Sequence, residues 1–291
     1  MRAGSLAQDC AEIAEYMVTR PTRSLAAASL DCATVFRNIA MECVALIEAH
    51  QEAACVGDAE AVHQSRVAIT RLRAAVAFFA PIVRDDEWLR LKTEIAWLND
   101  ALGAARDSDV VVAYAGRKRY RSWAEGVFGE SLDSRRAQHH RRLLRRLRSV
   151  RFRRLIAALA EWAGRGPARP DSAEPLERYC DRQLKSWRER LIRKGRHLDR
   201  LDGSRRHRLR IRVKRFRYML EALKEIIPLR GRGEWRRSAK RLQRVLGEIR
   251  DIERLCDLAG NKPPPGYRRR RDALLGSAVE AYRDFKRAGA R

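Results

Sequence analysis

Apolar residues recur at intervals of three and four residues along most of this chain, the spacing that places them on one face of an α-helix. No segment alternates apolar and polar residues in the way that a half-buried strand does. Helices are predicted over 25–56, 58–79, 86–114, 132–162, 176–201, 204–227, 234–258 and 267–287. The sequence therefore predicts an all-α fold.

Residues that cap or break helices divide this pattern into two halves. Asp58 is placed to cap the second helix, and Pro81 to end it. The Gly- and Pro-rich stretch 164–175, GRGPARPDSAEP, cannot continue a helix and is the clearest linker. We expect an N-terminal extension (1–24) and one domain (25–291), with halves 25–163 and 176–291 on either side of the linker.

An internal repeat with a constant offset of 144 residues relates the two halves. The same offset holds for two separate blocks without a gap, which is hard to reach by chance. The nine identities are His63/His207, Arg66/Arg210, Arg71/Arg215, Arg73/Arg217, Leu98/Leu242, Leu102/Leu246, Gly103/Gly247, Arg106/Arg250 and Asp107/Asp251. The chain is interpreted as a duplicated helical unit with its seam in the linker.

Cations form a stripe beside the apolar face of one helix in each half. At ~100° per residue, four cationic or titratable positions of the second copy fall within roughly an 80° arc. They are His207, Arg210, Lys214 and Arg217, and in the first copy His63, Arg66 and Arg73 correspond. A stripe at the flank of an apolar face is suited to line a groove between helices, although the same pattern occurs on ordinary solvated faces. Its repetition in register favours the groove.

The charge of the chain points to a polyanionic partner. Lys and Arg number 63 against 37 Asp and Glu, a formal net charge of +26. Hydrophobic residues make up 45% of the chain, which excludes a wholly disordered polyanion-binding tail. No apolar stretch is long enough to span a membrane, and acidic residues at Asp9, Glu12 and Glu15 argue against a signal peptide. We expect a cytoplasmic protein that is not inserted in a membrane.

The six cysteines show neither a C-x-x-C motif nor His at ligand spacing, so we expect buried free thiols, without a metal or cofactor. A P-loop, an H-E-x-x-H motif and paired carboxylates are absent from the sequence as well. The sequence therefore favours binding over catalysis, and we assign no catalytic residue.

Four segments together resemble the CHAD family, the conserved histidine α-helical domain. VHQSRVAITRLRAAVAFF (62–79) and RHRLRIRVKRFRYMLEAL (206–223) are similar to its two signature helices. LGAARDSDV and LGEIRDIE, which start at Leu102 and Leu246, resemble its leucine–glycine segments. SVRFRRLIAALAEW (149–162) is similar to its long fourth helix. The resemblance covers about residues 25–287.

This resemblance implies two pseudo-symmetric four-helix bundles that enclose a basic channel for inorganic polyphosphate. Position by position, it implies these channel residues: His63, Arg66, Arg71 and Arg73 in the first half, and His207, Arg210, Lys214, Arg215 and Arg217 in the second. Thr70 departs from a position that is usually basic in the family. Many relatives have an N-terminal triphosphate-tunnel domain, for which residues 1–24 leave no room, so a stand-alone domain is expected.

The chemistry of polyphosphate agrees with these residues, because a base-free polyanion calls for guanidinium forks rather than stacking aromatics. Tyr218 is the aromatic residue within the stripe, placed to bond a phosphate or to pack. Other phosphate or sulfate anions are expected to fit the same site. Two pairs of the repeat, Arg106/Arg250 and Asp107/Asp251, are interpreted as supporting residues that orient arginines. The pair Gly103/Gly247 is interpreted as packing residues.

Ten arginines between Arg135 and Arg154, with His139 and His140 and without an acidic residue, form the densest cluster of charge. Arg142 and Arg146 are the candidates from this cluster for an extension of the channel. Nucleic-acid binding through a basic helical surface is the alternative function, since charge alone fits it equally well. The role of polyphosphate binding stays open between granule attachment, storage and regulation.

Overall fold

The computed structural model describes residues 30–166, 174–224, 226–227, 231–260 and 262–289. All regular structure in these ranges is helical, so the prediction of an all-α fold is confirmed. Residues Asp31–Arg291 form one compact unit. The predicted N-terminal extension and most of the linker lie outside the described residues. Among the helices described, none is long and apolar enough to cross a membrane.

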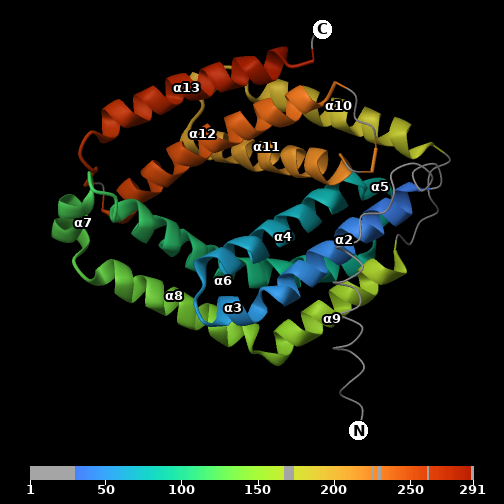
Figure 1. Ribbon diagram of the computed structural model, residues 1–291, viewed down its shortest axis with the longest axis horizontal. Helices are drawn as coiled ribbons and strands as arrows, with labels where there is room; N and C mark the ends of the chain where they lie inside the picture. The colour runs from blue at the N-terminus through green and yellow to red at the C-terminus, as the bar shows by residue number, and fades with distance from the viewer. Residues whose placement is uncertain (1–29, 167–173, 225, 228–230, 261, 290–291) are drawn as a thin grey trace. The chain divides into compact units, whose positions relative to one another are not determined.

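The helices before the linker begin where capping residues and patterning indicate. Asp58 Oδ1 accepts hydrogen bonds from the backbone N–H of Glu60 and Ala61, as expected for an N-cap. In chain order these helices are α2 (Cys32–Ala49), α3 (Gln51–Cys55), α4 (Ala59–Phe78), α5 (Ala80–Val83), α6 (Asp86–Ala115), α7 (Arg121–Phe128), α8 (Ser131–Leu147) and α9 (Val150–Arg165) (Figure 1).

The helices after the linker follow a simpler order, with four long helices and one short turn among the residues described there. Asp202 caps the third of these elements through a hydrogen bond from the N–H of Arg205. They are α10 (Leu176–Lys194), a 3-10 turn (Leu198–Arg200), α11 (Gly203–Leu223), α12 (Gly233–Leu258) and α13 (Tyr267–Arg287).

Three predicted helices are interrupted in the structure, and the one expected over 176–201 ends as an α-helix at Lys194, before the 3-10 turn. The helix expected over 25–56 breaks at His50, and the one expected over 132–162 breaks at Arg148–Ser149. Ser149 Oγ accepts a hydrogen bond from the N–H of Phe152, which makes it the N-cap of a new helix. The short helices α5 and α7 were not predicted.

Equivalent helices of the two halves meet in the middle of the unit. Both α10 and α11 begin 144 residues after α2 and α4, respectively. α4 packs against α11, and α6 packs against α12. The signature stripes are therefore brought to the junction of the halves, whereas the origin of the halves in a duplication stays a prediction.

A cluster of aromatic side chains packs between the two halves at the C-terminal end of α4. The rings of Phe78 and Phe79 contact Tyr179 of α10, at centroid distances of 6.1 and 5.7 Å. The hydroxyl of Tyr179 donates a 2.8 Å hydrogen bond to the carbonyl oxygen of Phe78. This dry contact fixes how α4 and α10 are placed and leaves the N-terminal part of α4, with His63, at the cationic junction.

Among the described cysteines, Cys43, Cys55 and Cys180 are buried free thiols, as predicted, while Cys32 is buried and Cys256 is half-buried. Burial raises the pKa of Cys43 and Cys180 to about 12, so both thiols are inert at neutral pH. Cys10 lies outside the described residues.

Candidate functional site

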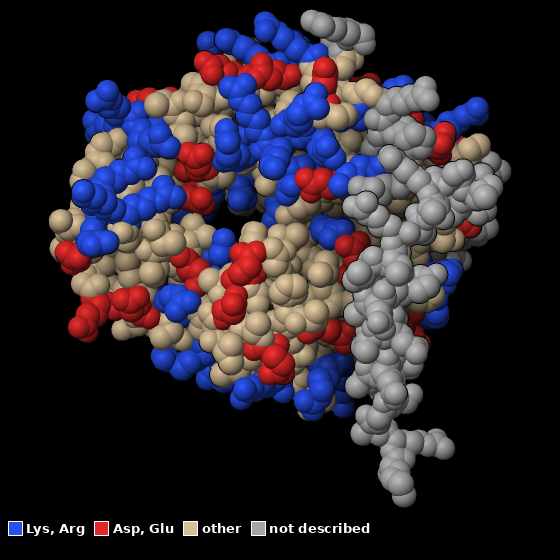
Figure 2. Space-filling view, in the orientation of Figure 1, with Lys and Arg blue, Asp and Glu red and all other residues tan. Residues whose placement is uncertain are grey.

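A cavity of about 740 Å³ lies between α4, α11 and α12. Eight of the residues that line it are Lys or Arg, and Glu221 is the one acidic residue among them. The lining consists of His63, Gln64, Val67, Arg71, Arg210, Lys214, Arg217, Tyr218, Glu221, Lys224, Arg236, Arg237, Lys240 and Gln243. Figure 2 shows this face hollowed near its centre, with Lys and Arg gathered over α11 and α12.

The amphipathic pattern of α11 explains why these side chains face the cavity. Leu209, Val213 and Phe216 are at most 2% exposed and pack in the core. The cationic arc lies directly beside this apolar face, so Arg210 and Lys214 are held at the flank of α11. The predicted division of the helix into an apolar face and a cationic flank is confirmed.

Lys214 lies at the centre of the positive charge. Burial lowers the pKa of its ammonium group, and Arg210, Arg66, Arg217 and Arg106 lower it further, to about 7. These neighbours come from α4, α6 and α11, so the cations of both halves converge on one region. Mutual repulsion of this kind costs folding free energy unless an anion offsets it.

Both signature histidines lie in the same region, and burial lowers the pKa of each. Arg106 and Lys214 lower that of His63 further, and Arg250 and Arg210 act in the same way on His207. His63 lines the cavity, whereas His207 does not. The Nδ1 atom of His207 and the Nε atom of Arg210 are buried and have no hydrogen-bond partner among the described residues.

The repeated glycines make room for the repeated arginines. A Cβ atom on Gly103 of α6 would come within 2.7 Å of Arg66 Nη1. On Gly247 of α12, a Cβ atom would lie 3.6 Å from Arg210 Nε. The packing role predicted for these glycines is thus specific: α6 leaves space for the guanidinium of Arg66, and α12 does so for that of Arg210 with more clearance.

These two glycines form a matched pair of test positions. Gly103→Ala is expected to weaken anion binding, because the added methyl group displaces the guanidinium of Arg66. Gly247→Ala is expected to leave binding nearly unchanged, since its Cβ would make an ordinary contact. Both substitutions should leave stability unchanged or raise it by up to about 1 kcal/mol, the gain in helix propensity. Thermal unfolding and titration with polyphosphate measure the two effects; equal binding losses in the two variants would contradict the steric explanation.

Among the supporting residues, Asp107 forms an ion pair that links the two halves. Asp107 of α6 pairs with Arg254 of α12 at 2.8 Å, across the junction. Burial raises the pKa of Asp251, which lies near Arg210, Arg117 and Arg106. A smaller cavity of about 180 Å³ adjoins the Asp107–Arg254 pair and is also lined by Arg135 and His139 of α8.

The other two supporting residues have weaker contacts. Arg106 donates to the carbonyl oxygen of Ala59 at 3.4 Å, and the guanidinium of Arg250 lies 3.8 Å from a carboxylate oxygen of Asp257. Arg106 also acts electrostatically on His63 and Lys214. Its guanidinium therefore belongs to the cationic cluster itself.

Comparison with known proteins agrees with this architecture. The CHAD domain family model matches residues 38–260, most of the chain. The chain belongs to the CHAD family. The crystal structure of the CHAD domain from the plant Ricinus communis is similar to it at 25% identity and a TM-score of 0.67, over 93% of this chain and 96% of that one. PptA from Streptomyces chartreusis shares the fold at 18% identity and a TM-score of 0.59, over 89% of this chain and 98% of that one. The search of curated proteins found no match.

Membership in the CHAD family fits a role related to polyphosphate. Among the cationic residues that the resemblance implied, Arg71, Arg210, Lys214 and Arg217 line the main cavity of this CHAD domain. Arg66 does not line this cavity, but it interacts electrostatically with Arg210, which does. Arg71 is also paired with Glu42 of α2, at 3.0 Å.

Four candidate residues of the CHAD domain lie elsewhere. Arg215 lines a separate pocket between α10 and α11, with Arg73 close by. Arg142 and Arg146 pair with Asp100 of α6, at 3.0 and 3.4 Å, and Arg146 also donates to the carbonyl oxygen of Trp97. In this structure they contribute to the packing of α8 on α6, outside the residues that line the main cavity.

The residues of α12 that line the main cavity were not predicted from the sequence. Arg236, Lys240 and Gln243 recur at four and three residues, a stripe that could have been recognised from its spacing. The repeat could not reveal it, because Ala96 occupies the position equivalent to Lys240. Arg254 has Val110 as its equivalent and was missed for the same reason.

Proposed function

We propose that this CHAD protein binds inorganic polyphosphate in the cavity between α4, α11 and α12 without transforming it. The observation that carries the proposal is the crowding of cations around Lys214, whose pKa of about 7 reflects burial and four neighbouring arginines. A flexible polyanion would follow the cavity, offset this repulsion and satisfy donors such as Arg210 Nε. Other inorganic phosphates or sulfate would compete for the same donors.

The shape and lining of the cavity favour polyphosphate over nucleic acid. Tyr218, the aromatic residue of the lining, is only 5% exposed. Its ring is contacted by the ammonium of Lys214 at 5.4 Å and by the guanidinium of Arg217 at 4.6 Å. The ring is therefore buried and close to two cations, whereas single-strand binding requires an aromatic ring that is open to a base. A duplex would need its cations on a convex surface.

A binding role without catalysis is supported by the acidic residues near the cavity. Phosphoryl transfer commonly uses carboxylates that hold a metal ion against the phosphates. Glu221 of the lining is paired with Arg217 at 2.5 Å, and Asp107 is paired with Arg254. In the part of the chain described, no group of three or more His, Cys, Asp or Glu residues is placed to hold a metal ion.

Competition at a fixed salt concentration tests the proposal. At ~150 mM salt, where screening limits generic charge effects, long-chain polyphosphate is expected to bind at least about tenfold tighter than RNA or duplex DNA at equal phosphate concentration. Fluorescence anisotropy with labelled polyphosphate measures the displacement. Displacement by duplex DNA at equimolar phosphate would restore the nucleic-acid alternative. Gel analysis of polyphosphate after incubation with the protein and Mg²⁺ should show unchanged chain length.

A further inference from the structure

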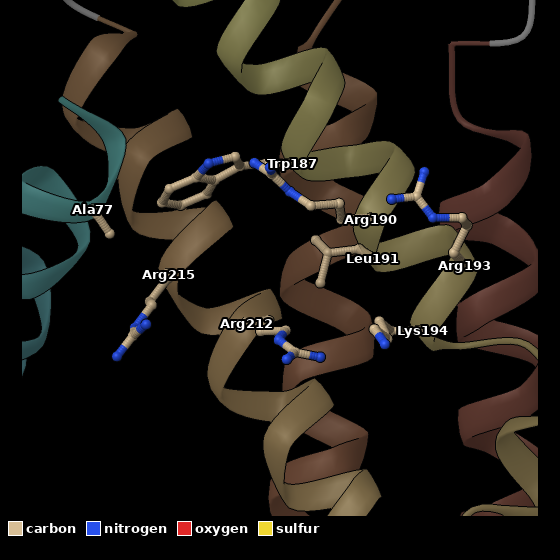
Figure 3. Close-up of a pocket in the computed structure, with 8 residues that line it drawn as sticks. All are labelled: Ala77, Trp187, Arg190, Leu191, Arg193, Lys194, Arg212 and Arg215. Atoms are coloured by element: carbon tan, nitrogen blue, oxygen red, sulfur yellow. The ribbon is translucent and has the colours of Figure 1, made fainter. Parts of the chain in front are cut away.

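A second pocket, of about 250 Å³, lies between α10, α11 and the end of α4. Its floor is apolar and consists of Trp187, Leu191 and Ala77. Figure 3 shows the Trp187 side chain reaching from α10 toward Ala77, with Arg212 and Arg215 on the neighbouring helix α11. The indole packs edge-on against Phe78, with 5.4 Å between ring centroids and an interplanar angle of 76°. This contact anchors Trp187 at one end of the pocket.

The rim of this pocket is entirely basic. It is formed by Arg190, Arg193 and Lys194 of α10 and by Arg212 and Arg215 of α11. None of the described residues that line the pocket is acidic, and none of the five cations has a carboxylate partner within the described part of the chain. Cations thus flank an apolar floor from two helices.

The guanidinium group of Arg215 is partly withdrawn from solvent. Its Nε atom is buried and has no hydrogen-bond partner among the described residues. Burial lowers the pKa of its guanidinium, and Arg73 and Arg212 lower it further. At the equivalent position of the first half, Arg71 is paired with Glu42, but the residue equivalent to Glu42 in the second half is Ser186. Arg215 therefore lacks the carboxylate partner that Arg71 has in the first half.

We propose that this pocket binds a small organic phosphate with a planar aromatic group, the chemistry of a nucleoside phosphate. The planar group would lie on the floor formed by Trp187 and Leu191, and the phosphates would bond the guanidinium groups of Arg212 and Arg215. Inorganic polyphosphate has no apolar part with which to cover this floor. An acyl chain would have to pass between the flanking cations. The site is separate from the polyphosphate cavity and does not depend on it.

Isothermal titration with ATP and with tripolyphosphate, which has phosphates but no base, tests this assignment. The background variant carries Arg66→Ala and Arg210→Ala, so that binding in the main cavity is reduced. In this background, ATP is expected to bind at least tenfold tighter than tripolyphosphate. Adding Trp187→Leu or Arg212→Gln should weaken ATP binding at least tenfold. The matched control Arg269→Gln removes an exposed charge from α13 and should change ATP binding less than twofold.

The outcomes separate this site from the polyphosphate cavity. In the otherwise unaltered protein, Trp187→Leu and Arg212→Gln should each leave the affinity for polyphosphate within twofold. ATP binding that is insensitive to both substitutions, or that is no tighter than tripolyphosphate binding, would overturn the assignment. Tighter binding of dodecyl phosphate than of ATP would do the same. Because Arg212 is exposed, its variant keeps the test valid if Trp187→Leu disturbs the contact with Phe78.

Discussion

Replacement of Arg66 and Arg210 together by alanine is expected to weaken polyphosphate binding by at least about 100-fold. Both guanidinium groups lie in the region where the halves meet, and each lies beside the repeated glycine of a neighbouring helix in its own half. Burial lowers the pKa of Arg66, and Arg210 is among its cationic neighbours. A charge-assisted hydrogen bond in such a confined site contributes on the order of 1.5–3 kcal/mol, so losing two of them has a large effect.

The matched control removes the same charge from the outside of the protein. Arg268 and Arg269 are exposed at the start of α13. Alanine at both positions should reduce the affinity less than about threefold and mainly decrease its dependence on salt. Anisotropy titrations at two salt concentrations measure both quantities, after circular dichroism has shown that each variant is helical. Equal losses in the two double variants would mean that only the total charge matters.

Much of the fold could be predicted because it depends on local signals. The apolar spacing of α11 and the capping residue Asp58 act within a few residues of the chain, and both were predicted correctly. The break at Ser149 was missed because the apolar residues of α8 and α9 continue with helical spacing across it. A serine that restarts a helix is recognised only when its hydrogen bond to Phe152 is seen.

The candidate site was predicted only in part, because helix packing decides which flank of a helix faces which neighbour. Arg71 and Arg215 are equivalent in the repeat, yet Arg71 lines the main cavity and Arg215 lines the pocket beside α10. The spacing along α4 and α11 is the same in both cases and cannot separate these positions. Arg142 and Arg146 illustrate the same limit: their stripe is cationic, but both side chains pair with Asp100, which is far away in sequence.

The pH dependence of binding is expected to identify Lys214 as the residue that responds between pH 7 and 9. In the free protein its pKa is about 7, so the ammonium group is about half protonated at neutral pH. A bound polyanion would favour the charged form and return the pKa toward its ordinary value of about 10.5. Binding therefore takes up protons, and affinity should fall by up to about 50-fold as the pH rises from about 7 to about 9.

Lys214→Arg should remove this dependence while keeping the charge, since arginine stays protonated throughout the range. The histidines act at lower pH: burial holds the pKa of His63 and His207 below 6.5, so their contribution should appear only on further acidification. His63→Gln with His207→Gln should flatten the acidic part of the profile and leave the fall in affinity above pH 7 unchanged. Titration calorimetry in buffers of different ionisation enthalpy counts the protons taken up.

The stability of the free protein should rise with pH while its affinity for polyphosphate falls. This opposite behaviour distinguishes the titration of Lys214 from a general loss of structure at alkaline pH. Between about pH 7 and 10.5 the unfolded chain binds a proton at Lys214 that the folded protein has released. Raising the pH through this window should therefore make the free protein more stable at this site while polyphosphate affinity falls. A thermal unfolding series of the unaltered protein against Lys214→Arg isolates the contribution. If both proteins showed the same affinity profile from pH 7 to 9, the cationic crowding around Lys214 would not be what polyphosphate relieves.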